Sequence, residues 1–402
     1  MVRRGMNLEN IKKSNRSAIL QTLQKHGALS RKDIASLVGL TPASVTIICS
    51  ELLEEGILVE LGEAVEEKRA GRKKILVSIN SDYKYVLCMG IEENETYLSI
   101  VNLSGQIIGS QTMPSDLNGD PEGFLRKAAM GCKAMLWEYQ IPKEKILAVG
   151  VSIPGKVDRK RGVRMKTSGL SGGEIPIRRI LQEELCYDVI IENNVKAYAK
   201  TEIVFGNGRS EDHIFMLKWG PGVGSAIIIN GEIYRGSTGT AAEIGHTMVR
   251  KDGKLCKCGR TGCLETEIST HAIMNAIQEA YDSCSRPEEE MPEFHAWLQS
   301  GHQLRYNNSG EWGALQDKKL QAILLKKAEY LAVATRNAVS LIDPDKIVVW
   351  GYLFDIPGLF EKFQEFYCSF DQERTKEFIV KSELQVRNTH TEALSIVMDE
   401  LI

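Results

Sequence analysis

One histidine and three cysteines lie close together in the 402-residue chain. His246, Cys256, Cys258 and Cys263 supply one imidazole and three thiolates, which is the ligand set of a closed tetrahedral zinc site. All four positions around the ion would then be protein ligands, so no position would remain for a reactive water. The spacing predicts a structural zinc ion in the loop 246–263. The alternative is a loop with scattered reduced cysteines.

Charged side chains surround this loop. Glu243 and Glu265 stand at its two ends, and carboxylates suit sugars because each accepts hydrogen bonds from neighbouring hydroxyls. We therefore expect both glutamates to bind a sugar, with His246 at the rim of the site. Lys257 and Arg260 lie between the cysteines and would offset the charge of three thiolates.

The order of these residues resembles the signature of the ROK family (repressors, open reading frames, kinases). An E-x-G-H motif at 243–246 leads into C-x-C-G-x-x-G-C-x-E at 256–265. The resemblance implies that His246 and the three cysteines bind zinc. It also implies that Glu243, His246 and Glu265 face a sugar.

The composition is that of an ordinary soluble protein, with 43% hydrophobic and 26% charged residues. We expect a cytoplasmic protein, because no apolar run reaches the length of a membrane span and the first residues lack a signal peptide. The nine cysteines suggest reduced thiols rather than a disulfide framework. Residues 1–75 carry 13 Lys or Arg against 9 Asp or Glu, and the remainder carries 37 against 44. A basic head on an acidic body favours a nucleic-acid partner for the head.

The head, residues 1–82, has the pattern of a winged helix-turn-helix. Apolar residues at helical spacing predict a first helix over 14–26 with Ser14 as its cap. A second helix is expected between Ser30 and Gly39, and a third should begin at Pro42. Two strands, ILVELGEA and KILVSIN, follow the helices. The basic connection between them would be the wing.

Small side chains early in the third helix suit a DNA major groove, where they can meet base edges or a thymine methyl. Basic residues of the connection could reach phosphates or a narrow minor groove. The alternatives are a three-helix unit that binds protein and a solvated charged hairpin. Ile47 is also expected on or near the exposed face of the third helix, beside these small side chains. The predicted DNA-binding residues are Arg31, Thr41, Ala43, Ser44, Thr46, Arg69, Arg72 and Lys73.

The body, residues 83–402, reads as an α/β domain with a mixed sheet. Strands with turns at 93–94 and 104–105 precede a helix in 121–140 and a strand at 146–155. A long helix is expected over 318–342, whereas 284–320 lacks clear periodicity and predicts an irregular connection. The family resemblance implies an actin-like, ribonuclease H-like fold of two lobes, as in the sugar kinase/ATPase superfamily.

The body departs from the pattern of ROK kinases. Glu92 and Glu93 replace glycines of a phosphate-binding turn, and Asn194 replaces the aspartate that acts as base. Asn193 and Asn194 can still bind sugar hydroxyls. Trp350 stands where a glycine borders the nucleotide, so it either crowds that place or packs into the core. Ser168-Gly169-Leu170 replaces a sugar-binding P-N-L segment, and glycines at 220, 222 and 224 resemble a second phosphate loop.

These features together favour a sugar-responsive transcriptional repressor of carbohydrate-metabolism genes, without enzymatic activity. Its partners would be double-stranded operator DNA, a monosaccharide and further copies of itself. A homodimer or tetramer would read a palindromic operator, since one small head binds weakly. Zinc would be its only cofactor. The competing interpretations are a sugar kinase that acquired a DNA-binding head and a repressor controlled by a protein partner.

Overall fold

The computed structural model describes residues 8–63, 75–165, 173–206, 211–384 and 389–401. The chain divides into two compact units. Unit 1 comprises Met1–Ile153, Pro176–Glu192 and Thr389–Ile402, and unit 2 comprises Pro154–Ile175 and Asn193–Asn388.

Three helices form the head, as the sequence predicts: α1 (Leu8–His26), α2 (Arg31–Val38) and α3 (Pro42–Glu54). The Ser30 hydroxyl accepts a hydrogen bond from the Asp33 amide, and Gly39 ends α2 in the left-handed conformation. The first helix begins at Leu8, not near Ser14, because the preceding residues are also good helix formers. Buried side chains from all three helices form one core that includes Ile19, Leu23, Ile34, Val45, Ile48 and Leu52.

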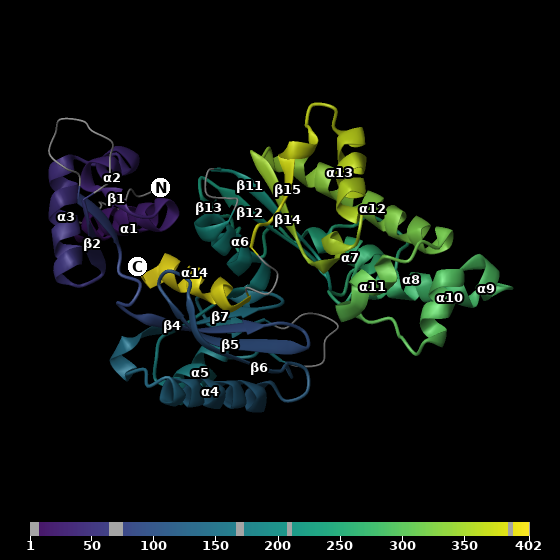
Figure 1. Cartoon of the computed structure of the whole chain (residues 1–402), viewed down its shortest axis with the longest axis horizontal. Coiled ribbons are helices and arrows are strands. Elements are labelled where there is room, and N and C mark those ends of the chain that lie inside the picture. Colours follow the sequence, from purple (N-terminus) through teal and green to yellow (C-terminus); the bar gives the residue numbers. More distant parts are fainter. Residues whose placement is uncertain (1–7, 64–74, 166–172, 207–210, 385–388, 402) are drawn as a thin grey trace. The chain divides into compact units, whose positions relative to one another are not determined.

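Three strands complete the head. β2 (Leu58–Glu63) pairs antiparallel with β3 (Ile75–Ile79), and the short β1 (Leu29–Ser30) pairs with the other edge of β3. Helices followed by this sheet make a winged helix-turn-helix (Figure 1). The wing residues Arg69, Arg72 and Lys73 lie in 64–74, outside the described residues.

Unit 1 also holds a mixed five-stranded sheet of order β10-β7-β4-β5-β6. β4, β5 and β6 are antiparallel neighbours, whereas β4 and β7 are parallel. Helix α14 covers one face, and α4 and α5 cover the other (Figure 1). The elements are β4 (Tyr85–Ile91), β5 (Glu95–Asn102), β6 (Ile107–Pro114), α4 (Pro121–Glu138), η1 (Lys143–Lys145), β7 (Ile146–Ile153), α5 (Ile177–Leu185), β10 (Val189–Asn193) and α14 (Thr389–Leu401).

Unit 2 is built on a second five-stranded sheet of order β13-β12-β11-β14-β15. Alternate residues of β11 face opposite sides. Met216 therefore packs with α6, whereas Phe215 and Leu217 pack with α12. The elements are β8 (Val157–Asp158), β9 (Val163–Arg164), α6 (Asn194–Phe205), β11 (Ile214–Trp219), β12 (Val223–Ile229), β13 (Glu232–Ile233), α12 (Lys318–Ile342), β14 (Lys346–Trp350), η5 (Tyr352–Asp355), α13 (Leu359–Phe370), η6 (Lys376–Phe378) and β15 (Ile379–Lys381).

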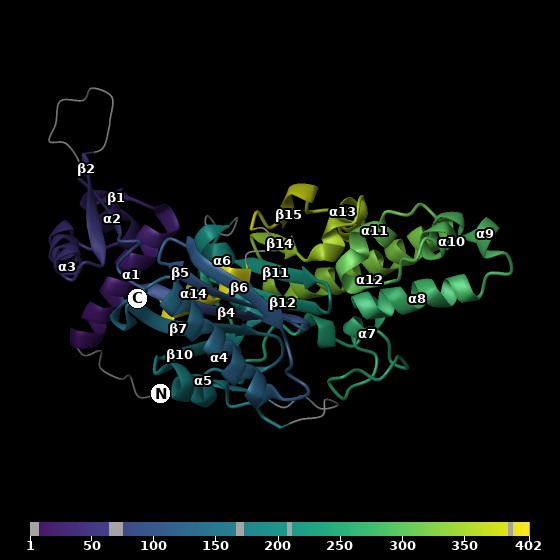
Figure 2. The ribbon, with the colours of Figure 1, turned by 60° about the horizontal axis from the view of Figure 1, so that its bottom comes forward.

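Helix α12 has the predicted bounds and is the longest described helix. It contacts α13 and α8 (Thr270–Asp282), beside which it runs in Figure 2. Among the described residues no single helix is long and apolar enough to cross a membrane, and α2 with α3 meets that test only as a pair bent by 117°.

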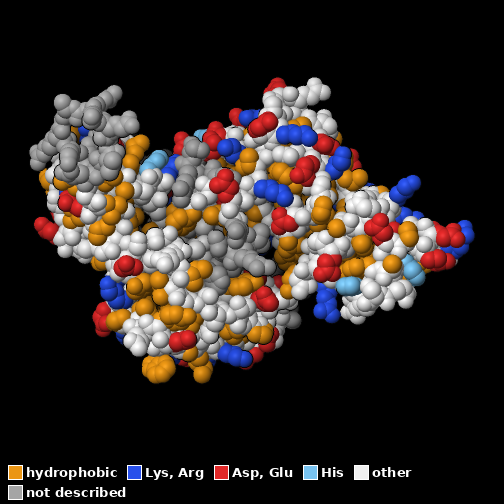
Figure 3. Space-filling view, viewed as in Figure 1, with side chains coloured by type: hydrophobic (Ala, Val, Ile, Leu, Met, Phe, Trp, Pro, Cys, Tyr) orange, Lys and Arg blue, Asp and Glu red, His pale blue; other side chains and the backbone are white. Residues whose placement is uncertain are grey.

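The prediction of an irregular connection over 284–320 is wrong in part. This segment contains α9 (Pro287–Glu290), α10 (Pro292–Gln299), η4 (Tyr306–Asn308) and α11 (Ser309–Gly313). Each has eight residues or fewer, which is shorter than the window over which apolar periodicity is recognised. Phe294 and Trp312 are nevertheless fully buried in the unit 2 core, while charged side chains gather at the α9 end (Figure 3).

Candidate functional site

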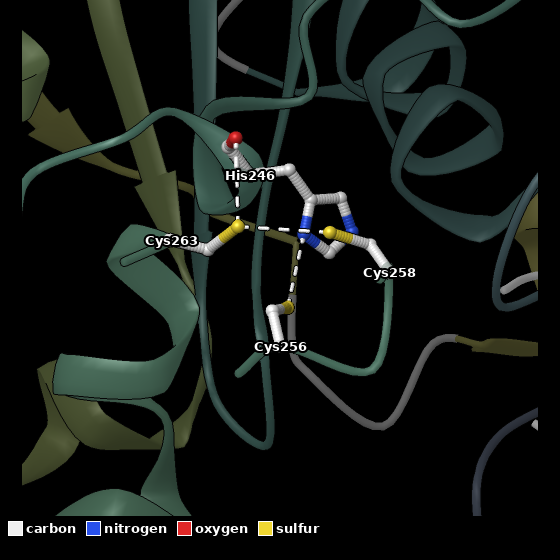
Figure 4. Close-up of side chains that lie close together, drawn as sticks. All are labelled: His246, Cys256, Cys258 and Cys263. Atoms are coloured by element: carbon white, nitrogen blue, oxygen red, sulfur yellow. Dashed lines mark hydrogen bonds between the residues drawn. The ribbon is translucent and has the colours of Figure 1, made fainter. Parts of the chain in front are cut away.

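The four predicted zinc ligands converge in unit 2. The ligand atoms of His246, Cys256, Cys258 and Cys263 all lie within 4.8 Å of one another (Figure 4). His246 Nδ1 is 3.6 Å from Cys256 Sγ, and the sulfurs of Cys258 and Cys263 are also 3.6 Å apart. Zn–S bonds of about 2.3 Å in a tetrahedron place sulfurs roughly 3.8 Å apart. One nitrogen and three sulfurs at these separations therefore fit a zinc ion.

Backbone hydrogen bonds shape the loop that carries the cysteines. The Cys256 amide donates to the Arg260 carbonyl at 2.8 Å, and the Gly259 amide donates to the Cys256 carbonyl at 2.8 Å. Gly262 has φ +72° and lies so close to the Arg250 carbonyl that a Cβ there would clash at 1.6 Å. A residue without a side chain is needed at this turn. The turn at Gly262 brings the Cys263 sulfur back beside the other two sulfurs.

The three thiols have different proton affinities. Burial, with the neighbouring thiols, raises the pKa of Cys263 to about 12, and burial also raises the pKa of Cys256. Burial acts in the same direction on Cys258, but hydrogen bonds from the Arg260 amide and the other thiols, with the Arg260 charge, lower its pKa overall. Arg260 thus supports a thiolate, as expected. A bound zinc ion would supply the remaining stabilisation, because zinc binds the deprotonated sulfur.

The start of β12 brings the two predicted carboxylates into one neighbourhood. Glu243 directly precedes η3 (Ile244–His246), and Glu265 is the second residue of α7 (Leu264–Ile268). Both η3 and α7 contact β12 and each other. Glycine permits this approach, because a Cβ at Gly222 would lie 2.8 Å from Glu265 Oε2.

The two carboxylates differ in their partners. Glu265 Oε2 accepts a hydrogen bond from the Val223 amide at 3.3 Å, and Oε1 lies 3.0 Å from Lys257 Nζ. Its side chain is 13% exposed. Within the described residues, no hydrogen bond to the half-buried Glu243 carboxylate is found. Lys257 therefore faces a carboxylate of the predicted sugar site, which differs from its expected role beside the thiolates.

The predicted asparagines lie at the beginning of α6, which also contacts β12. Asn193 caps the helix: its Oδ1 accepts from the amides of Val195 and Lys196, and its Nδ2 donates to the Gly155 carbonyl at 3.0 Å. Asn194 is buried, with Oδ1 3.0 Å from the Val195 amide. Asn193 thus has a structural role that the sequence pattern did not indicate.

The glycine-rich turn between β11 and β12 is covered by an aromatic ring. A Cβ at Gly220 would lie 2.9–3.1 Å from ring atoms of Tyr352. The Tyr352 hydroxyl is 2.8 Å from Thr270 Oγ1, and the Thr270 amide donates to the Pro221 carbonyl at 2.9 Å. Sequence analysis did not single out Tyr352. This residue directly follows Trp350 and Gly351, which stand at the two glycine positions of the family pattern.

Trp350 packs into the core, which was one of its two expected roles. Its indole is 6% exposed and stacks on Tyr198 of α6, with ring centroids 4.2 Å apart and planes inclined by 7°. The Tyr198 hydroxyl donates to the Leu384 carbonyl at 2.9 Å. Two other departures are less informative: Glu92 and Glu93 lie in the β4–β5 turn, and Ser168-Gly169-Leu170 lies outside the described residues.

The described DNA-binding candidates lie on the head. Thr41 caps α3, with its hydroxyl accepting from the Ser44 amide, and the Thr46 hydroxyl donates to the Pro42 carbonyl at 2.7 Å. Thr41, Ala43, Thr46 and Ile47 are exposed, and Ser44 is partly so. Arg31 instead pairs with Glu60 of β2 at 2.8 Å. Its guanidinium thus links α2 to the wing strand.

Comparison with known proteins gives two family matches. The family described as ROK family matches residues 87–396, and the family described as winged helix-turn-helix DNA-binding matches residues 13–59. A xylose repressor from Caldicellulosiruptor bescii is 27% identical over 367 residues, which cover 88% of this chain and 87% of that protein.

Solved structures agree with this result at the level of the fold. A ROK family transcriptional regulator, described as a homologue of the Escherichia coli MLC protein, has a TM-score of 0.78 at 20% identity and covers 97% of this chain and 96% of its own. A ROK family glucokinase from Streptomyces griseus, solved with glucose and AMPPNP, has a TM-score of 0.62 at 22% identity. It covers 78% of this chain and 98% of its own.

Proposed function

Because this chain belongs to the ROK family and carries a winged helix-turn-helix DNA-binding domain, we propose that it is a sugar-responsive transcriptional repressor of carbohydrate-metabolism genes. The xylose repressor that it resembles over most of its length supports this proposal. The head binds operator DNA in the cytoplasm. The body binds a monosaccharide and controls the head.

The observation that carries the proposal is the convergence of η3 and α7 on the start of β12. It gathers Glu243, Glu265 and His246 beside the cluster of soft ligands. Carboxylates are acceptors only and suit the hydroxyl groups of a sugar. Asn194, buried at the start of α6, adds an amide. Asn193 contributes by holding the end of that helix.

His246 and the three cysteines would hold a structural zinc ion. These four ligands would fill every position of the ion, so the ion would hold the loop between the two carboxylates and supply no reaction chemistry. His246 would hold the ion through a ring nitrogen, and its Nδ1 lies 3.6 Å from Cys256 Sγ. Its ring orientation is thereby set for the sugar site.

Three observations favour a sensor over a kinase. Asn194 is neutral and cannot take a proton from a sugar hydroxyl. Trp350 fills the side of β14 that faces α6, and Tyr352 covers the glycine-rich turn. The glucokinase with the same fold keeps the kinase as the second candidate. That candidate predicts MgATP binding, which the sensor does not.

DNA control requires the sugar to bind one state of the protein more tightly than another. Two or four copies would place their heads on the half-sites of a palindromic operator. Thr41, Ala43, Ser44 and Thr46 would meet base edges, and Arg69, Arg72 and Lys73 of the wing would meet phosphates. Sugar binding would alter the relative placement of the heads. Arg31 acts mainly within the head, through Glu60.

The test is calorimetry on zinc-loaded protein with D-xylose, D-glucose, N-acetyl-D-glucosamine and MgATP, followed by DNA binding with and without each ligand. We expect one sugar to bind and to change operator affinity, and MgATP to give no heat. Binding of MgATP with formation of sugar phosphate would replace the sensor with the kinase. If none of the sugars binds, control by a protein partner replaces control by a sugar as the favoured interpretation.

The zinc proposal has its own test. Cys258→Ser should lower zinc affinity by roughly tenfold or more, because loss of an outer-shell partner alone costs about that much. It should also weaken sugar binding, because the loop between Glu243 and Glu265 would no longer be held by the ion. Cys186→Ser, which alters an exposed cysteine of unit 1, is the control and should change neither. Full sugar binding by zinc-free protein would remove the structural role of the ion.

A further inference from the structure

The zinc loop presents one charged side chain to the sugar site. Lys257 lies between two of the proposed zinc ligands, Cys256 and Cys258. Its side chain is 56% exposed, and Nζ lies 3.0 Å from Oε1 of Glu265. An exposed ion pair contributes only about 0–1 kcal/mol, yet this pair includes a carboxylate that is only 13% exposed and belongs to the proposed site.

The pair offers both kinds of hydrogen bond at one point. Glu265 Oε2 accepts from the Val223 amide at 3.3 Å and Oε1 lies 3.0 Å from Lys257 Nζ, so a sugar oxygen that meets Oε1 also meets the ammonium. Lysine only donates and carboxylate only accepts, whereas a sugar hydroxyl does both. One hydroxyl can therefore donate to Glu265 and accept from Lys257. Bonds to charged groups of this kind are stronger than neutral ones.

We propose that Lys257 is an effector-binding residue, which reads an oxygen of the sugar beside the hydroxyl held by Glu265. This inference rests on the proposed sugar-sensing function. Lys257 thereby selects ligands that present an acceptor at this position, and it does so from the zinc loop rather than from the sheet. Glu243 has no such cation beside it among the described residues.

The position of Lys257 also links metal and sugar. Binding of an ion by Cys256 and Cys258 would fix the backbone on both sides of Lys257 and so order its ammonium for the sugar. Coupling between two ligands is reciprocal: if zinc strengthens sugar binding, the sugar strengthens zinc binding by the same factor. In a variant without the ammonium, the part of this coupling that passes through Lys257 is lost.

Lys257→Met tests the inference while keeping the length of the side chain. With whichever of D-xylose, D-glucose or N-acetyl-D-glucosamine binds the wild type, we expect calorimetry to show at least tenfold weaker binding, as for loss of a hydrogen bond to a charged group. Lys257→Arg should recover part of the affinity. The matched control is Lys251→Met, another exposed lysine of the same loop, and its affinity should equal that of the wild type.

A second measurement uses zinc rather than sugar as the readout. Competition with a chelating indicator should show that saturating sugar raises zinc affinity in the wild type and in Lys251→Met, and raises it much less in Lys257→Met. Circular dichroism and zinc content verify that each variant is folded and loaded. Equal sugar affinity for Lys257→Met and wild type overturns the inference alone, and tighter binding shows the lysine to be a competitor. Absence of sugar binding to the wild type removes the proposed function, and this inference with it.

Discussion

Replacing Trp350 by glycine restores the residue that the ROK kinase pattern has at this position. If the indole only blocks a nucleotide site, its removal should open the site at little cost. The structure predicts a different outcome, because Trp350 is 6% exposed and stacks on Tyr198 at 4.2 Å. It belongs to the cluster that joins α6 to the sheet of unit 2.

The magnitude follows from the lost packing. Truncation of a buried tryptophan costs about 3–5 kcal/mol, and glycine within a strand adds roughly 0.5–1 kcal/mol. For a urea m-value of about 3 kcal/mol/M, a loss of about 4 kcal/mol lowers the midpoint by roughly 1.3 M. The assay is urea unfolding followed by circular dichroism. Trp137→Ala is the control, because this side chain is 85% exposed and should shift stability by less than about 0.5 kcal/mol.

Two outcomes would refute this reasoning. A Trp350→Gly midpoint within experimental error of the wild type would show that the stack contributes nothing to unit 2. Binding of MgATP by the same variant would show that the indole was the main obstacle to a nucleotide. Trp350→Phe distinguishes ring stacking from volume, and we expect it to recover most of the lost stability.

Further predictions concern the sugar site, the DNA-binding face and the stability of the head. Gly222→Ala should weaken sugar binding about tenfold in calorimetry, since its Cβ would displace Glu265, whereas Gly310→Ala meets nothing within 4 Å and should have no effect. Ile47→Ala, at a side chain 61% exposed on α3, should weaken operator binding by about 1 kcal/mol in fluorescence anisotropy without lowering the melting temperature. Leu37→Ala, on α2, is its control. The Arg16 hydrogen bond lowers the pKa of Glu55 from 4.5. A carboxyl group whose pKa is lower in the folded state stabilises the fold at pH values above its unfolded-state pKa. This stabilisation is lost as the pH falls through the folded-state pKa. Arg16→Met should therefore lower head stability by at most about 1 kcal/mol at pH 7, and thermal melts should show this difference vanishing in acid.

Features that depend on neighbouring residues could be predicted from the sequence. Ser30, Gly39 and Pro42 mark helix ends through local hydrogen bonds and backbone preference, and the structure has all three boundaries as expected. The cluster of proposed zinc ligands could be predicted for the same reason. Its ligands lie within 18 residues, so a few tight turns suffice to bring them together.

Features that depend on distant residues could not be predicted in this way. The contact of Tyr352 with the turn at Gly220 joins positions far apart in the chain. The direction of Lys257 could not be inferred either, because neighbouring thiolates and Glu265 are both plausible partners for a cation. Asn193 illustrates a third case: its type suits both a helix cap and a sugar contact, and only the geometry reveals the cap.

The glycines of the β11–β12 turn explain why a phosphate-loop pattern alone cannot separate a kinase from a sensor. Gly222 makes room for the Glu265 carboxylate, and Gly224 makes room for Val195 beside Asn194. Packing against Glu265 and Val195 thus requires both glycines, whether or not a nucleotide binds. The distinguishing residues are those that fill the space around the turn. Tyr352 lies against Gly220, and its hydroxyl is 2.8 Å from Thr270 Oγ1. A test for a return of phosphoryl transfer therefore has to replace Tyr352 and Trp350, change Asn194 to aspartate, and restore glycine at Glu92 and Glu93.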